Sequence, residues 1–289
     1  MNSESPAQST VVPPGPVAEV APMAPSAPRP LSPPPRRKLW LPVAAVVVAV
    51  GVVLAILFIA GGFNASSGGA ARVGTPMAFS RAVPLAVDYG RGASGGPWTV
   101  VAAEGIGIAA GITQPNTKFL GSGGCTFSPV PGGTESVSLL GTPSNATPGE
   151  VATWFFFATN ASLEVVLLIL VSDGTTTPLV FVTGCSEVST FTGLSSVSGS
   201  SVVDSTTVAA SFDQNAGGAS FLANHTSATQ VFGLIGPSAT PSGSSAAWSI
   251  MYTSCGLTTA GGSGSWLQAG YDAGSGSLLV GPSAGSGPC

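Results

Sequence analysis

The chain is poor in the side chains on which most catalytic and nucleic-acid-binding sites depend. Its 289 residues include eight Lys and Arg, twelve Asp and Glu, and a single histidine, His225. Nucleic acids and anionic lipids are bound by clustered basic side chains, and only four basic residues follow residue 60. We therefore expect no nucleic-acid partner. Because the acidic residues stand singly and one histidine forms no cluster, we expect neither a metal ion nor another cofactor.

The low charge also predicts how the protein responds to acid. Acid unfolds ordinary proteins when their carboxylates are protonated and the remaining basic groups repel one another. Since the region after residue 60 has four basic and ten acidic residues, little repulsion would arise. The sequence therefore predicts a domain that stays folded at pH 2–3.

Cysteine is scarce, and all four cysteines follow residue 60: Cys125, Cys185, Cys255 and Cys289. An even number of cysteines in an extracellular region predicts two disulfides, for which three connectivities exist. The wide spacings do not suit zinc, which favours close pairs. We favour Cys255–Cys289, which would hold the C-terminal tail, and hence Cys125–Cys185.

The most conspicuous feature that is present is an uncharged apolar run from Leu41 to Ala60, preceded by Arg36-Arg37-Lys38. A twenty-residue helix is about 30 Å long and matches the hydrocarbon core of a bilayer. We predict a transmembrane helix over 39–60, with residues 1–38 in the cytoplasm and the C-terminal domain extracellular, because basic residues favour the cytoplasmic side. The alternative is a cleaved signal peptide ending at Ala60-Gly61-Gly62.

The remaining regions divide by composition. Residues 1–38 are proline-rich and are expected to be a disordered cytoplasmic tail, either a spacer or a docking site. Residues 61–74 form an expected flexible stalk, and 75–289 an extracellular domain, with two sub-domains near 75–195 and 196–289 as an alternative. Small residues four apart in the helix, Ala45/Ala49 and Gly51/Ala55, would allow a weak homodimer.

Four of the seven asparagines begin N-x-S/T sequons: Asn64, Asn145, Asn160 and Asn224. All four lie on the predicted outer side, in segments typical of turns. We expect at least one of them to be glycosylated in a host that has the enzymes.

The firmest structural pattern lies between residues 150 and 185. Residues 153–157 (TWFFF) predict a strand, 165–171 (VVLLILV) a strand buried on both faces, and 179–182 (LVFV) a third strand. Turn residues separate them, so we expect an antiparallel three-stranded meander. Two buried faces need cover, so helices should pack on at least one of them.

Helices are expected on both sides of this meander along the chain. Asp204-Ser205 predicts the start of a helix through Phe212, with a short second helix at Phe221-Leu222. Thr75-Pro76 would cap a helix that runs to Tyr89, and Pro84 would kink it or delay its start. The predicted fold class is thus a single-pass membrane protein with an α+β ectodomain, an antiparallel sheet with helices packed on one face.

The C-terminal part predicts more sheet, in strands at 230–235, 248–252, 266–271 and 278–280. The helix after Asp204, followed by W-x-I-x-Y at 248–252 and Y-D-A-x-S-G-x-L-L at 271–279, resembles PepSY-like and cystatin-like modules. This resemblance covers 204–280 and implies a helix packed on an antiparallel sheet. The whole layout is similar to single-pass archaeal-type surface proteins with proline-rich cytoplasmic tails.

A helix leading to a Trp-containing strand occurs twice, at 76–102, where the strand is 98–102, and at 205–252. This recurrence indicates an internal duplication.

Three patterns imitate catalytic or nucleotide-binding motifs. G-x-S-x-G occurs around Ser94 and Ser283, and a hydrolase would pair one of them with His225 and with an acid such as Asp204 or Asp213. Neither serine lies in a strand–turn–helix context, so chance in Gly/Ser-rich sequence explains both matches. Residues 105–110 (GIGIAA) fit a loose dinucleotide fingerprint, but no strong helix follows, and a Gly-rich strand is the simpler interpretation.

Three functions remain as hypotheses. The first is a non-catalytic, membrane-anchored cell-surface protein in the envelope or in adhesion, with a surface protein or glycan as partner. The second is an extracellular binding module for a peptide, glycan or small solute, which a pocket rimmed by Trp98, Trp248 or Trp266 would favour; tryptophans buried under helices would favour a structural role. The third is a secreted hydrolase.

Overall fold

The computed structural model describes residues 63–67, 69, 72–112, 115–119, 124–160, 162–198, 201–239, 245–255 and 263–288. The chain separates into two units, Met1–Lys38 and Leu39–Cys289. All described residues belong to the second unit, and only this unit is considered below.

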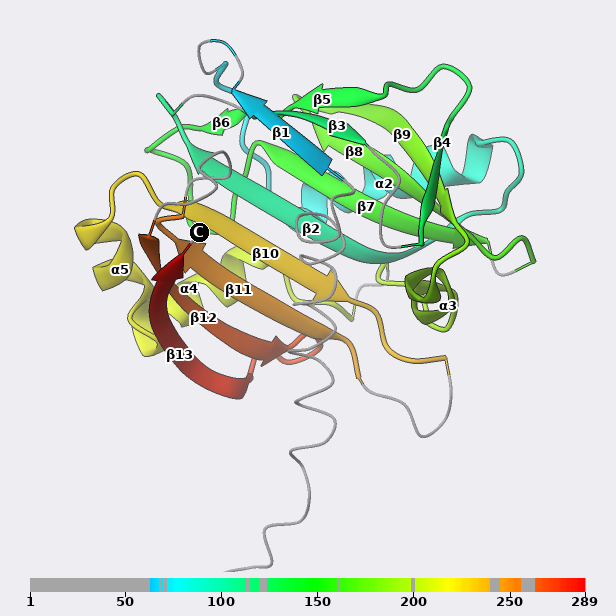
Figure 1. Ribbon diagram of the computed structural model, residues 1–289. Helices are drawn as coiled ribbons and strands as arrows, with labels where there is room; N and C mark the ends of the chain where they lie inside the picture. Colours follow the sequence, from blue (N-terminus) through cyan, green and yellow to red (C-terminus); the bar gives the residue numbers. More distant parts are fainter. Residues whose placement is uncertain are drawn as a thin grey trace, which may run out of the picture. The chain divides into compact units, whose positions relative to one another are not determined.

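A large, almost entirely antiparallel sheet dominates the described residues (Figure 1). Its strand order is β13-β12-β11-β10-β2-β7-β8-β9-β4, and the short β6 pairs in parallel with the end of β2. The strands are β2 (Thr99–Ala109), β4 (Thr126–Pro129), β6 (Gly141–Thr142), β7 (Thr153–Asn160), β8 (Val165–Ser172), β9 (Thr175–Thr183), β10 (Thr229–Ile235), β11 (Ala247–Thr253), β12 (Ser263–Asp272) and β13 (Leu278–Pro288).

The large sheet is covered by a second sheet, which has three short strands, and by four described helices. The small sheet has the order β1-β3-β5, with β1 (Phe63–Ser67), β3 (Pro115–Phe119) and β5 (Ser136–Ser138). The helices are α2 (Phe79–Gly92), α3 (Ser186–Thr192), α4 (Ser205–Asn215) and α5 (Gly218–Asn224).

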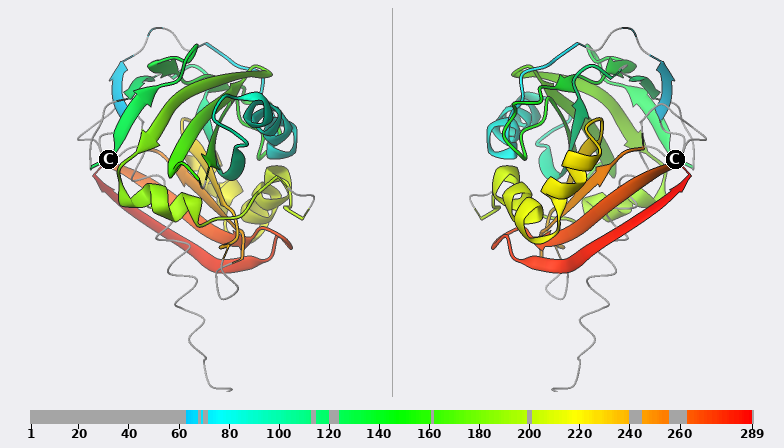
Figure 2. Two further views of the ribbon diagram at one scale, coloured as in Figure 1. Left: turned by 90° about the vertical axis from the view of Figure 1, so that its right-hand side faces the viewer. Right: turned by 90° about the vertical axis from the view of Figure 1, so that its left-hand side faces the viewer.

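The two faces of the large sheet carry separate apolar cores. On one face α2, α4 and α5 pack over Trp154, Phe232 and Trp248, and on the other α3 and the small sheet pack over Ile106 and Phe157. The two views in Figure 2 show α2 and α4 on one side of the large sheet and the small sheet on the other. The expectation of helices on one face only is therefore wrong, because β8 is apolar on both faces and each face needs cover.

The expectation of a single-pass membrane protein is also corrected. Among the described residues, no helix is long and apolar enough to cross a membrane. The longest described helix, α2, has 14 residues and carries Arg81, Asp88 and Arg91. At 1.5 Å per residue it reaches about 21 Å, less than the ~30 Å of a hydrocarbon core. The predicted span 39–60, the tail 1–38 and the helix contacts proposed for a homodimer lie outside the described residues.

The predicted meander is confirmed as β7, β8 and β9, paired antiparallel in sequence order. The predicted C-terminal strands are also present as β10 to β13, joined in the same way. The described residues thus form an α+β unit that is mostly antiparallel sheet.

The topology repeats within this unit. In each half a helix leads into a four-stranded antiparallel meander: α2 into β2, β7, β8 and β9, and α4 into β10 to β13. The halves join where β2 pairs with β10. The first half has an insertion, β3 to β6, between its first two meander strands. The arrangement supports the duplication expected from the sequence.

Two buried tryptophans mark equivalent places in this repeat. Trp154 donates its indole N–H to the carbonyl of Met77, two residues before α2 begins, at 2.9 Å. Trp248 donates to the carbonyl of Val203, two residues before α4 begins, at 3.0 Å. The equivalent of Trp248 is therefore Trp154, and not Trp98 as the sequence pattern indicated.

The starts of α2 and α4 are joined by hydrogen bonds. Asp204 immediately precedes α4, but its carboxylate accepts the N–H of Ser80 at 2.8 Å, and the hydroxyl of Ser205 accepts the N–H of Phe79 at 2.9 Å. Both amides belong to the first turn of α2, where no partner exists within the helix. The prediction that Thr75-Pro76 caps this helix is wrong, because α2 begins at Phe79 and Ala78 is its N-cap residue.

Candidate functional site

A small apolar cavity lies beneath α3, on the face of the sheet that carries the small sheet. Strands β4, β7, β8 and β9 form one side of it, and α3 with its N-cap residue forms the other. Its lining residues are Phe127, Phe157, Val166, Leu168, Val182, Cys185, Glu187, Val188 and Phe191. Its volume of about 20 Å³ is sufficient for one group of the size of a water molecule or a methyl.

Two contacts hold α3 over this cavity. The rings of Phe157 on β7 and Phe191 on α3 stack with their centroids 5.0 Å apart and their planes 3° from parallel. The disulfide between Cys125 and Cys185 joins the start of the edge strand β4 to the N-cap position of α3. This is one of the two pairings favoured from the sequence.

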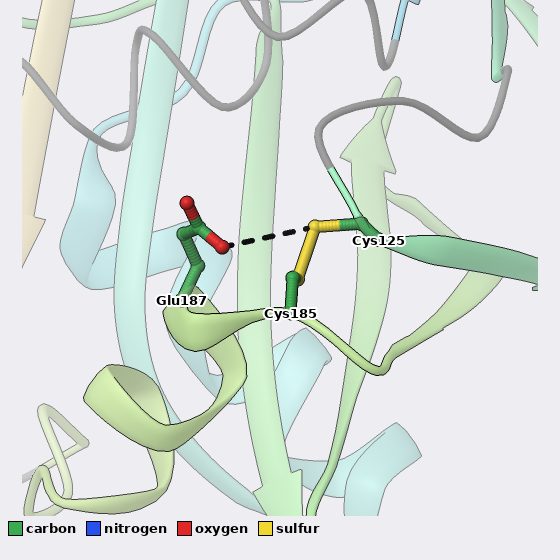
Figure 3. A group of neighbouring side chains, drawn as sticks. All are labelled: Cys125, Cys185 and Glu187. Atoms are coloured by element: carbon green, nitrogen blue, oxygen red, sulfur yellow. Dashed lines mark hydrogen bonds between the residues drawn. A yellow bond between two sulfur atoms is a disulfide. The ribbon is translucent and has the colours of Figure 1, made fainter.

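The exposed wall of the cavity is apolar throughout, so Glu187, in the first turn of α3, lines it with aliphatic atoms while its carboxylate lies beside it. Glu187 Oε2 lies 3.9 Å from Cys125 Sγ (Figure 3). The same oxygen accepts a hydrogen bond from the hydroxyl of Ser186 at 3.2 Å. A disulfide sulfur has no proton, so the first contact is not a hydrogen bond. The carboxylate therefore retains capacity for another hydrogen-bond donor or a cation beside the cavity.

Cys125, Cys185 and Glu187 bring three potential ligand atoms within 4.8 Å of one another. Cysteine binds metals as a thiolate, and both sulfurs here are committed to the disulfide. This group of side chains therefore does not fit a metal ion.

The remaining predicted disulfide is described only in part. Cys255 is disulfide-bonded, and no described cysteine is free. Cys289 lies outside the described residues.

Glu104 is the second chemically unusual group. It lies in the middle of β2 with only 1% of its surface exposed, and neither carboxyl oxygen has a hydrogen-bond partner among the described residues. Burial raises the pKa of Glu104 from its ordinary value of 4.5 to about 8, because removal from water disfavours the charged form. The sequence contained no signal for this, since Glu104 is a single acid in an otherwise apolar strand.

A third polar group lies on the face covered by α2, α4 and α5. The hydroxyl of Tyr252 on β11 donates to Asp213 on α4 at 3.1 Å. Burial raises the pKa of Asp213, and the hydrogen bond from Tyr252 offsets part of that shift. The hydroxyl of Tyr271 is buried without a partner, and burial raises its pKa to about 12. These phenols stay protonated at neutral pH.

The histidine and the two acids considered for a hydrolase have other partners, and the two serines lie elsewhere. The ring of His225 stacks on Phe221, with its Nδ1 3.0 Å from the Phe221 carbonyl oxygen. Asp204 binds α2 as described above, and Asp213 binds Tyr252. Ser94 lies in an exposed turn after α2, and Ser283 lies on the edge strand β13. Within the described ranges, no observed hydrogen bond joins any of these four residues to His225.

The glycine pattern at 105–110 lies on the sheet and not at a nucleotide-binding turn. Gly105 and Gly107 belong to β2. A Cβ at Gly105 would lie 2.8 Å from ring atoms of Trp154, and one at Gly107 2.9 Å from Val151. These glycines allow close packing in the core, and the interpretation as a Gly-rich strand is confirmed.

The tryptophans do not line the cavity. Trp98, Trp154 and Trp248 are buried in the core covered by α2, α4 and α5. Trp266 on β12 is half-buried and lies against Gly285 of β13. A cavity rimmed by tryptophans is therefore not found among the described residues, and the three buried rings have a structural role.

The four sequons differ in their surroundings. Asn145 and Asn224 are exposed. The side-chain amide of Asn160 donates to the Gly95 carbonyl at 2.6 Å and accepts from the N–H of Ser162 at 3.0 Å. Asn64 lies in β1. Asn145 and Asn224 are thus the sequons best placed for a glycan.

Comparisons with protein-family models, with curated proteins and with solved structures give no match.

Proposed function

We propose that this protein is a non-catalytic, extracytoplasmic binding module that holds the apolar end of a ligand in the cavity beneath α3. The observation that carries the proposal is an apolar cavity with a carboxylate beside it, that of Glu187, which retains hydrogen-bonding capacity. Concave apolar sites with a few polar groups are typical of small-molecule binding sites. An extracytoplasmic location is supported by the disulfides, which persist in oxidising compartments.

The chemistry of the cavity narrows the ligand class. Its volume suits a methyl-sized terminus, while the carboxylate favours an ammonium group or another hydrogen-bond donor a few atoms away. An alkylammonium ion, a small solute or a peptide side chain that carries an amine fits this description. A ligand with an anionic group in the same place would be repelled.

The test compares linear alkylammonium ions with alkylsulfonates of equal chain length, followed by the NMR shifts of the methyl groups of Val166, Val182 and Val188. We expect the cation to bind and the sulfonate to bind at least about tenfold more weakly, a difference of about 1.4 kcal/mol. Glu187→Gln should reduce this preference without abolishing contact with the alkyl chain. Equal binding of both ions would contradict the assignment of Glu187.

A cavity-filling variant provides the second arm of this test. Val188→Leu adds one methylene group beneath α3 and should abolish binding. The matched control is Val87→Leu, a half-buried valine in α2 on the opposite face of the sheet, which should leave binding unchanged. Unaltered binding in Val188→Leu would show that the ligand occupies another place.

A second candidate function is a structural or adhesive protein of the cell surface. It is favoured by the three tryptophans buried under helices and by the exposed sequons at Asn145 and Asn224. Intact mass before and after deglycosylation, on protein from its native source, tests it. Added hexose mass that is lost in Asn145→Gln and Asn224→Gln would support a glycosylated surface protein.

A further inference from the structure

Glu104 is a buried carboxyl group on a face of β2 whose described neighbours along the strand are apolar. Along β2 it lies between Ala102 and Ile106, which belong to the core shared with α3 and the small sheet. Because side chains two residues apart in a strand share a face, Glu104 points into this core. Its surface is 1% exposed, and neither oxygen is hydrogen-bonded to a described residue, so no donor in the described part of the chain stabilises a charge on it.

The described elements around Glu104 supply no compensating charge. Its cross-strand neighbours are Phe155 on β7 and Gly233 on β10. The ionisable side chains on the other described elements of this face are Lys118 on β3, Glu135 before β5 and Glu187 on α3. Lys118 and Glu135 are exposed at the surface, and Glu187 binds the Ser186 hydroxyl. None of them is a partner of Glu104.

The position of Glu104 is also the centre of the repeat. Gly105 pairs with Trp154, and Leu234 pairs with the equivalent Trp248. The equivalent of Glu104 in the second half is therefore Gly233, the residue directly opposite it in the β2–β10 pair. A charge at this point destabilises the strand pair that joins the two halves, so it should lower the stability of the whole sheet.

We propose that Glu104 is a proton-operated stability switch at the junction of the two halves. Uncharged, it is tolerated in the core and the sheet is stable. Ionised, it is an unpaired buried charge that weakens the β2–β10 junction. The protein is thereby adapted to acidic surroundings and loses stability as its surroundings change from acidic to neutral. This inference is independent of the ligand proposed for the cavity beneath α3.

The direction of the pH dependence follows from proton linkage. The folded-state pKa, about 8, lies above the ordinary value of 4.5, so between these limits the folded state binds a proton that the unfolded state has lost. The contribution of protonated Glu104 to the free energy of unfolding is complete below pH 4.5 and is lost as the pH rises to about 8. The unfolding constant then rises by up to about tenfold per pH unit in this window.

The test is urea unfolding of the full chain with its disulfides intact, from pH 5 to pH 9. Glu104→Gln keeps the shape of the side chain but cannot ionise, so its unfolding constant should rise less steeply with pH than that of the wild type. When each unfolding constant is divided by its value at pH 5, the ratios of the two proteins should differ by at least about tenfold at pH 8.5. The dependence of the unfolding constant on pH is compared, and not its absolute value, because a buried amide without partners itself lowers the free energy of unfolding.

The matched control is Glu135→Gln, an exposed carboxyl near the same face, which should keep the wild-type slope. Equal slopes in wild type and Glu104→Gln would overturn the proposal. If the variant does not fold, the ¹³C carboxyl shift of Glu104 in the wild type replaces it. A titration midpoint of this shift clearly above the ordinary pKa range of glutamate supports the switch, and a midpoint near 4.5 overturns it.

Discussion

Ser205 shows how one small polar side chain can connect distant parts of the chain. It is fully buried at the first position of α4. Its hydroxyl accepts the N–H of Phe79 at 2.9 Å and donates to the carbonyl of Gly149 at 2.8 Å. The residues joined are 126 and 56 positions away in sequence. The hydroxyl thus satisfies two backbone groups that are removed from water.

We expect Ser205→Ala to lower the free energy of unfolding by about 1–3 kcal/mol, because it leaves a buried donor and a buried acceptor without partners. Urea denaturation measures the change. Ser196→Ala is the control: its hydroxyl is exposed and pairs with that of Ser198, so the change should stay within about 0.5 kcal/mol. Equal effects of the two variants would contradict the structural role of Ser205.

At the residue scale, the sequence indicated types of side chain but not their partners. Asp204 was expected before α4 and is found there, yet its carboxylate binds the start of α2. Glu104 was one of several single acids, and only its place in the sheet, on the face covered by α3 and the small sheet, removes it from water. Such partners depend on contacts between segments far apart in sequence, which a local pattern does not contain.

At the scale of elements, α3 depends on the connection made by the Cys125–Cys185 disulfide. Helix α3 has seven residues, and helices so short are not stable on their own in water. The disulfide ties its N-cap residue to the start of the four-residue edge strand β4. We infer that the cavity beneath α3 keeps its shape because of this link.

Removal of the disulfide by Cys125→Ser together with Cys185→Ser should lower the free energy of unfolding by about 2–4 kcal/mol, since a loop of 60 residues is no longer closed. Hydrogen exchange should accelerate in α3 and β4 and remain slow in the central strands β2, β7 and β8. Uniform acceleration in all these elements would contradict a local role of the link.

The elements that the sequence predicted well are the long apolar ones. Strand β8 is buried on both faces, as its continuous apolar run indicated, and β7 and β9 flank it in the expected order. Helix α3 and the strands β1 and β3 to β6 were missed. They are short, with Ser, Thr and Gly at many positions, and they are ordered by pairing with other segments.

For the whole molecule, the low charge predicts resistance to acid. Within the described part of the chain, the ion pairs are Arg72–Asp173 and Arg91–Asp88, in both of which the basic side chain is highly exposed. Surface pairs contribute little to stability, so little is lost when their carboxylates are protonated. Glu104 is uncharged in acid and adds no penalty there.

We therefore expect the near-UV circular dichroism of the chain with intact disulfides to persist at pH 2–3. The measurement should be repeated at low and high salt, because charge repulsion is screened by salt. Loss of the near-UV signal at low pH that salt restores would show that the remaining positive charge is sufficient to unfold the domain.

The sequence alone determined the features that depend on local composition and periodicity. These include the buried meander, the C-terminal strands, the placement of the cysteines and the scarcity of charge. Only the tertiary structure decided that helices cover both faces, that Trp154 is the equivalent of Trp248, and that Glu104 is buried opposite Gly233. The reason is that strand order and register determine which side chains lose contact with water, and both are set by pairing between distant segments.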